Sequence, residues 1–422
     1  MTTAEPIRYA REITVIGAVF TLAYLLGLAE VVSWSFMPRS QLGLLRFLPA
    51  ALIIGLTLAA ALLSGGIARL VWLSIIRNWP LALLCVYVAA GGMYTRFVLD
   101  SKESFFGHAI GMLVFFATWT LATRIGPVRA IVPLLRASIP FWLVMFGVVC
   151  YGFAIGKHLA HEIMYVFAPL PLYLGLTART RGGRIIAFAA IVLVAAMGLK
   201  NTTLIIGAFS VFMLWIFSQP EVRSGIRPPL TIKSVVLFAV VALVAYAGWS
   251  HLSANIGEFS SGNTDFRQYN YARLWNMFLV SPMMGDRFIG TPNLMFDLYQ
   301  IELGQNLPSH SDLLDVLAHG GLLGAIPLAL FIAMIVISFL RTCARPGSDE
   351  TYAAQVTLFA VAISALFTST GNPVWANPTN AFMFWASLGL CQALNNPHRD
   401  HEVGTWWRSR VPRETESTSM AA

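Results

Sequence analysis

Twelve apolar runs divide the chain, and most are separated by short segments rich in charged residues, glycine or proline. They cover residues 13–32, 44–63, 80–95, 104–122, 139–156, 163–178, 185–199, 203–217, 234–249, 317–340, 353–370 and 380–394. A helix needs about 20 apolar residues to cross the hydrocarbon core of a bilayer. Runs near this length with few charges therefore predict an all-α protein, a polytopic membrane helix bundle of about 12 transmembrane helices.

The connection between the ninth and tenth runs is much longer than the others. Long loops in compact proteins are usually functional or disordered, and the aromatic content of this one disfavours disorder. Its aromatic residues are Phe259, Phe266, Tyr269, Tyr271, Trp275, Phe278, Phe288, Phe296 and Tyr299. We expect a partly helical loop that folds back onto the membrane face and carries the functional site. The chain then divides into nine spans (1–248), the loop (249–311), three spans (312–395) and a polar tail (396–422).

Composition and charge agree with this organisation. The chain is 57% hydrophobic and only 11% charged, which leaves too little polar surface for a water-soluble globule. Of the 28 Lys and Arg residues, 19 fall in alternate connections on one side of the predicted spans. The positive-inside rule makes that side, and both termini, cytoplasmic, and it puts the long loop on the outer side. This asymmetry explains the net charge of +8 without a nucleic-acid partner.

Within the long loop, residues 264–280 have the pattern of a helix, with Thr264 as N-cap and Ser281–Pro282 as the stop signal. At 100° per residue, Arg273 shares a face with Phe266, Tyr269, Asn270 and Met277, and Arg267 lies beside Asn270, Tyr271 and Leu274. Both guanidinium groups therefore point toward an anionic ligand or toward lipid headgroups. Snorkelling to headgroup phosphates is the structural alternative, and for either residue alone it is equally favoured.

His310 precedes the tenth apolar run, in a stretch where Ser309-x-x-Asp312 has the spacing of a capping box. The dipole of a helix N-terminus disfavours the imidazolium form, so a neutral His310 is suited to act as a general base. The alternative is a structural, hydrogen-bonded histidine. Asp312 either orients His310 or caps the helix, and for His319 we expect a structural hydrogen bond within the bundle.

Other candidate ligands give weaker signals. The four cysteines lie within or beside apolar runs without C-x-x-C spacing, which disfavours disulfides and a zinc site. No third residue with metal spacing accompanies His310 and Asp312, so we predict no required metal and no cofactor. Lys200 lies in a very short outer hairpin, where a phosphate group or a lipid headgroup is its natural partner.

Two motifs together carry a resemblance to a known family. They are Arg273…Trp275…Ser281-Pro282-x-x-Gly285-x-x-Phe288, and Ser309-His310-Ser311-x-Leu313-Leu314-x-x-Leu317-x-x-Gly320-Gly321-Leu322-x-Gly324. Over about 60 residues they resemble the signature of the O-antigen ligase and polysaccharide polymerase superfamily (Wzy, WaaL and ExoQ-like). The span count and the long outer loop are similar to that family as well. Ser311 stands where the family usually has Asn, and Lys200 where it has Arg. These departures favour the exopolysaccharide polymerases.

The resemblance implies an integral glycosyltransferase of the bacterial inner membrane, with its active face in the periplasm. The donor would be a polyprenyl-diphosphate-linked glycan. Arg273 would stabilise the departing diphosphate, His310 would act as base, and direct attack by a sugar hydroxyl would invert the anomeric carbon. Assisting cations would be Arg267, Arg287 or Lys200, and supporting residues would be Asp312, Ser309 and Tyr271.

Three readings of the function stay open at this point. In a polymerase the acceptor is another lipid-linked repeat unit, whereas in a ligase it is the lipid A-core sugar. Chain-length regulators or export proteins are possible partners of either enzyme, beside the membrane lipids. A transporter should place ionisable residues at mid-membrane. The few in the predicted spans, chiefly Glu30, Asp315 and His319, lie toward the outer side, and no internal repeat is visible.

Overall fold

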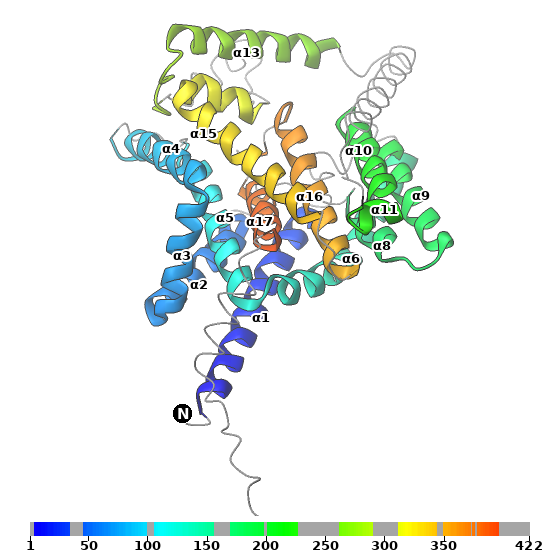
Figure 1. Ribbon diagram of the computed structural model, residues 1–422. Coiled ribbons are helices and arrows are strands. Elements are labelled where there is room, and N and C mark those ends of the chain that lie inside the picture. The colour runs from blue at the N-terminus through cyan, green and yellow to red at the C-terminus, as the bar shows by residue number, and fades with distance from the viewer. Residues whose placement is uncertain are drawn as a thin grey trace, which may run out of the picture.

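The computed structural model describes residues 4–33, 45–98, 105–155, 169–197, 201–226, 261–289, 311–343, 349–372, 374–375 and 378–395. Within these ranges the chain forms helices and turns and no strand, which confirms the all-α class (Figure 1). The helices are α1 (Ala4–Ser33), α2 (Leu48–Leu63), α3 (Gly65–Arg77), α4 (Trp79–Phe97), α5 (Phe106–Ile125), α6 (Pro127–Ala154), α8 (Leu170–Thr177), α9 (Arg181–Met197), α10 (Asn201–Phe217), α11 (Pro220–Arg223), α13 (Ser261–Val280), α15 (Asp312–Cys343), α16 (Asp349–Ser369) and α17 (Pro378–Leu394).

Seven helices in the described ranges are long and apolar enough to cross a membrane: α1, α2, α4, α5, α6, α15 and α16. Residues 202–217 of α10 form a shorter apolar helix. The predicted ninth span, 234–249, lies outside the described residues. The chain is therefore a helical protein with several segments of membrane-spanning length, which is the coarse form of the sequence prediction.

Two predicted connections are helical instead. The connection predicted over residues 64–79 contains α3 (Gly65–Arg77). Residues 127–138 form the first part of α6, although the sequence predicts that this helix begins near residue 139. Both stretches carry arginines among apolar residues, and arginines in such positions predict the ends of spans. A helix tolerates these arginines because a long side chain on an exposed face reaches out to water or headgroups.

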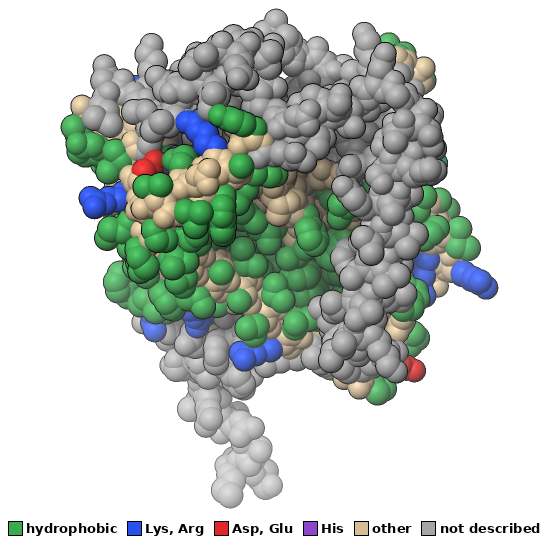
Figure 2. All heavy atoms as spheres, turned by 90° about the horizontal axis from the view of Figure 1, so that it is seen from above, with side chains coloured by type: hydrophobic (Ala, Val, Ile, Leu, Met, Phe, Trp, Pro, Cys, Tyr) green, Lys and Arg blue, Asp and Glu red, His purple; other side chains and the backbone are tan. Residues whose placement is uncertain are grey.

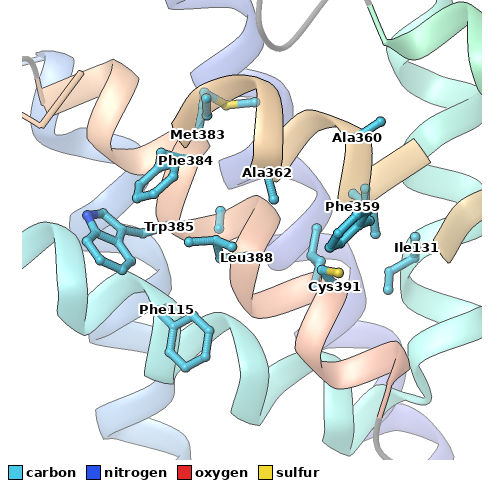
Figure 3. Packing of buried hydrophobic residues seen from close by; sticks show 14 of the residues in the cluster. Phe115, Ile131, Phe359, Ala360, Ala362, Met383, Phe384, Trp385, Leu388 and Cys391 are labelled. Atoms are coloured by element: carbon cyan, nitrogen blue, oxygen red, sulfur yellow. The ribbon is translucent and has the colours of Figure 1, made fainter. Parts of the chain in front are cut away.

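The core of the bundle lies around α5, α16 and α17, whose side chains are mostly buried. Figure 1 shows α17 in the middle of the molecule, and Figure 3 shows Phe115, Phe359 and Trp385 from these three helices among its buried residues. Phe359 of α16 also stacks on Phe339 of α15, with ring centroids 3.7 Å apart. Packing of α15, α16 and α17 gives the rigid frame on which the loop residues rest.

The two ends of α16 contact different parts of the chain. At its start, Glu350 pairs with Arg136 of α6, and Asp349 Oδ1 lies 2.7 Å from an Arg223 guanidinium nitrogen. Just beyond its other end, Thr370 accepts a hydrogen bond from a residue of the long loop. A 21-residue helix is about 30 Å long, so residues predicted as cytoplasmic and residues predicted as external lie at opposite ends of this helix.

Candidate functional site

Helix α13 carries Arg273 and lies across the end of the bundle, above α15 in Figure 1. It ends at Val280, as the Ser281–Pro282 signal predicts. It begins at Ser261 rather than at Thr264, so the N-cap assigned to Thr264 is wrong. Residues 261–263 form the first part of the helix, ahead of Thr264.

Helix α15 is broken in its first third, and the turn that follows α13 fits into the break. Gly321 has φ 56° and ψ −154°, which separates a short first half, Asp312–Gly320, from the rest of the helix. The Leu322 N–H donates to the Pro282 carbonyl over 2.8 Å, and the Leu323 N–H donates to the Met283 carbonyl over 3.0 Å. The turn thereby satisfies backbone groups that the break leaves without helical partners.

Two glycines make this close approach possible. A Cβ at Gly285 would lie 2.5 Å from the Ala318 carbonyl oxygen, and a Cβ at Gly321 would lie 2.6 Å from the backbone of Met283. Both residues also have a φ of +56°, a conformation that glycine adopts at little cost. Gly285 and Gly321, one from each motif, are therefore required by the contact between the turn and α15.

Phe288 anchors the far end of the turn. Its side chain is 1% exposed and packs edge-on against Tyr87 of α4 and against Phe105. Its N–H donates to the His319 carbonyl over 3.0 Å. Arg287 and Phe288 both have positive φ, which costs about 1–3 kcal/mol for each non-glycine residue. Burial of the Phe288 ring offsets this strain.

Gly91 of α4 supports the same turn and gives a direct test of the docking. A Cβ at Gly91 would lie 2.1 Å from the Arg287 carbonyl oxygen, so Gly91→Ala should destabilise the protein by about 1–3 kcal/mol through overpacking. The measurement is the apparent Tm of the detergent-solubilised protein. Gly55→Ala on α2, where nothing lies within 4 Å, is the control and should keep or raise the Tm. Equal Tm values for the two variants would contradict the docked turn.

An open cavity of about 510 Å³ lies between α13, the turn and the first half of α15. Its lining residues are Tyr269, Ala272, Arg273, Asn276, Met277, Val280, Ser281, Gly285, Asp286 and Ala318. The prediction that Tyr269 and Met277 share a helix face with Arg273 is thus confirmed. Asn270 is buried and does not line the cavity, because it lies about 60° around the helix from Arg273. Figure 2 views this end of the molecule from above and shows charged side chains beside hydrophobic ones.

Asp286 of the turn was not identified from the sequence. Its Oδ2 lies 2.6 Å from Nδ1 of His319, so a hydrogen bond joins the turn to α15. The structural hydrogen bond expected for His319 is confirmed, and its partner is a carboxylate that the sequence pattern does not identify. The residues are 33 positions apart, and helical periodicity carries no information about contacts at such a separation.

Two of the predicted supporting residues meet at the turn between α16 and α17. The Tyr271 hydroxyl donates to the Thr370 carbonyl over 3.4 Å. Oδ2 of the buried Asp312 accepts the Val374 and Trp375 N–H groups at 2.7 and 3.0 Å. The apolar runs that end at residue 370 and begin at residue 380 predict a connection here, but its contact with Asp312 could not be predicted from them. The carboxylate of Asp312 thus ties the start of α15 to the turn.

The N-cap of α15 is Ser311. The helix begins at Asp312, and Ser311 Oγ accepts the Leu314 N–H over 3.3 Å. The capping box proposed for Ser309 and Asp312 is therefore wrong, because the cap is two residues later and the Asp312 carboxylate bonds to another segment. Serine and asparagine are equally good N-caps, so Ser311 keeps the local structure that the Asn of the family motif would give.

The remaining predicted site residues are placed as follows. Arg287 is exposed on the docked turn and does not line the cavity. His310, Ser309, Lys200 and the side chain of Arg267 lie outside the described residues. The described residues therefore bring Arg273, Tyr271 and Asp312 to one end of the bundle, together with Asp286 and His319.

No group of three or more His, Cys, Asp or Glu side chains in the described ranges is arranged to hold a metal ion. Comparison of the chain with models of known protein families and with curated proteins found no match.

Proposed function

We propose that this protein is a membrane glycosyltransferase of the bacterial inner membrane, acting at its periplasmic face. It transfers a glycan from a polyprenyl-diphosphate-linked donor to a sugar hydroxyl. The observation that carries the proposal is the open cavity at the end of the bundle, lined by Arg273 and bounded by the first half of α15. His310 immediately precedes Ser311, the N-cap of that half-helix, in the sequence.

The chemistry requires few groups, because a diphosphate is already a good leaving group. The acceptor hydroxyl oxygen attacks the anomeric carbon, and the bond from that carbon to the diphosphate oxygen breaks with its electron pair. His310 takes the hydroxyl proton, and Arg273 stabilises the negative charge that develops on the diphosphate. A single displacement inverts the configuration of the anomeric carbon.

The distribution of buried charge supports a reaction at one face rather than transport through the bundle. Among the described residues, the buried Asp, Glu, Lys, Arg and His side chains are Asp312, Asp315 and His319. All three lie in the first half of α15, at the end where α13 lies. A transport path would place such residues near mid-membrane.

For the acceptor, we propose another lipid-linked repeat unit, which makes the protein a polymerase of exopolysaccharide or O-antigen. Lys200 in place of the family arginine favours this acceptor. Ser311 does not distinguish the two acceptors, because it acts as an N-cap in the same way as asparagine. The lipid A-core acceptor of a ligase is the competing outcome in the experiment.

The test compares the surface glycan of a strain that lacks this protein with the same strain carrying the wild-type gene, by gel and by lipid extraction. We expect single repeat units and no long chains in the deletion strain, with long chains restored by the gene. Long chains stranded on polyprenyl diphosphate, with bare lipid A-core, would show a ligase instead. Repeat units trapped at the cytoplasmic face would overturn both enzymatic functions in favour of transport.

A further inference from the structure

The hydrogen bond between Asp286 and His319 joins a side chain of the turn to a side chain of α15. His319 is fully buried, and within the described part of the chain its Nε2 has no hydrogen-bond partner. A buried polar atom without a partner costs free energy. The Nδ1–H bond to Asp286 is therefore the hydrogen bond that the His319 imidazole makes within the described residues, and it is directed at the turn.

Asp286 connects this bond to the cavity. Its side chain is 26% exposed and lines the same cavity as Arg273. The turn follows α13 directly at Val280, and Arg273 lies about two helical turns before that end. A bond that fixes the position of Asp286 thus fixes both this wall of the cavity and the end of α13, the helix that carries Arg273.

The backbone next to Asp286 shows that the turn needs such a contact. Arg287 and Phe288 are held in the left-handed region, which non-glycine residues occupy only when their surroundings impose it. The His319 backbone contributes on the same side, since its carbonyl accepts the Phe288 N–H. Both polar ends of His319, the carbonyl and the imidazole, therefore hold adjacent parts of the turn.

We propose that Asp286 and His319 form a positioning pair that sets where Arg273 lies over the cavity. The proposal rests on the glycan transfer proposed above, in which Arg273 faces the departing diphosphate. Neither residue needs to contact the substrate. A misplacement of about 1 Å in a reacting geometry lowers the rate on the order of 10²-fold.

The first experiment removes or preserves the bond. Two variants remove the bond: His319→Leu lacks the donor, and Asp286→Ala lacks the acceptor. Two variants preserve it: His319→Asn places an amide N–H near the position of Nδ1, and Asp286→Asn keeps an acceptor oxygen. Ser210→Ala is the control, a buried serine of α10 that bonds within its own helix. The kcat and KM for chain elongation are measured in membranes, with the lipid-linked fraction extracted from the deletion strain as substrate.

We expect His319→Leu and Asp286→Ala to lower kcat on the order of 10²-fold with KM unchanged. The double variant should be no slower than either single variant, because both remove the same bond. His319→Asn, Asp286→Asn and Ser210→Ala should retain most of the activity. Losses that multiply in the double variant, a change in KM alone, or His319→Asn as slow as His319→Leu would overturn the proposal.

A second measurement does not depend on the reaction. Ala318 is 1% exposed and lines the cavity beneath the turn, so Ala318→Cys in a Cys150→Ala background reports whether the turn is docked. A charged thiol reagent should label it slowly in the otherwise wild-type protein and with His319→Asn, and faster with His319→Leu. Equal labelling rates would overturn the positioning pair. If the wild-type protein elongates no glycan, the proposed function fails and the labelling still decides the role of the pair.

Discussion

Alanine at Arg273 is expected to slow glycan transfer by about 10²–10³-fold, because one preorganised electrostatic donor is commonly worth about 3 kcal/mol in the transition state. Arg273 lines the open cavity from α13, and in the proposed reaction its charge is needed most when the diphosphate departs. The loss should therefore appear in kcat rather than in KM. The measurement is the initial rate of chain elongation in membranes, with the lipid-linked fraction of the deletion strain as substrate.

Two further variants make this prediction specific. Arg273→Lys keeps the charge but loses the planar, bidentate donor geometry, so its rate should fall between those of wild type and Arg273→Ala. Arg181→Ala removes an exposed arginine at the start of α9, on the predicted cytoplasmic side, and should leave the rate unchanged. An Arg273→Ala protein that inserts normally and keeps the wild-type rate would exclude the proposed role.

Features that depend on neighbours in the sequence could be predicted well. Apolar runs located most of the helices, and the Ser281–Pro282 signal located the end of α13 at Val280. The 100° rotation per residue put Tyr269, Arg273 and Met277 on one face, which lines the cavity. These predictions succeed because hydrophobic periodicity and helix stop signals act within a few residues of one another.

Features that depend on distant contacts could not be predicted. The break at Gly321 is invisible in the apolar pattern, because both halves of α15 have helical periodicity. The turn that docks into the break reaches it because α13 lies across the end of the bundle, and the apolar pattern does not predict that arrangement. The same holds for Asp312, whose bonds to Val374 and Trp375 join positions 62 and 63 residues apart. A capping role inferred from local spacing therefore failed there.

The short half-helix Asp312–Gly320 joins the parts of the candidate site. Asp312 fixes its first residue to the turn between α16 and α17, and His319 holds the turn that follows α13 at its other end. Nine residues of helix span about 14 Å. This half-helix is thus attached at one end to the segment that carries Arg273, and at the other end it begins beside the residue that follows His310 in the sequence. The proposed reaction needs a cation and a base at a fixed separation, and one rigid element between them would provide it.

His310→Ala is expected to lower the elongation rate by about 10²–10⁴-fold, the usual contribution of a general base. The residue precedes the N-cap Ser311 in the sequence, and the dipole of a helix N-terminus favours the neutral imidazole that a base requires. Ser311→Asn is the neighbouring control and should keep the rate, since asparagine caps a helix as well as serine does. Full activity of a His310→Ala protein that folds and inserts would exclude the base assignment, and the acceptor hydroxyl would then have to lose its proton to another group.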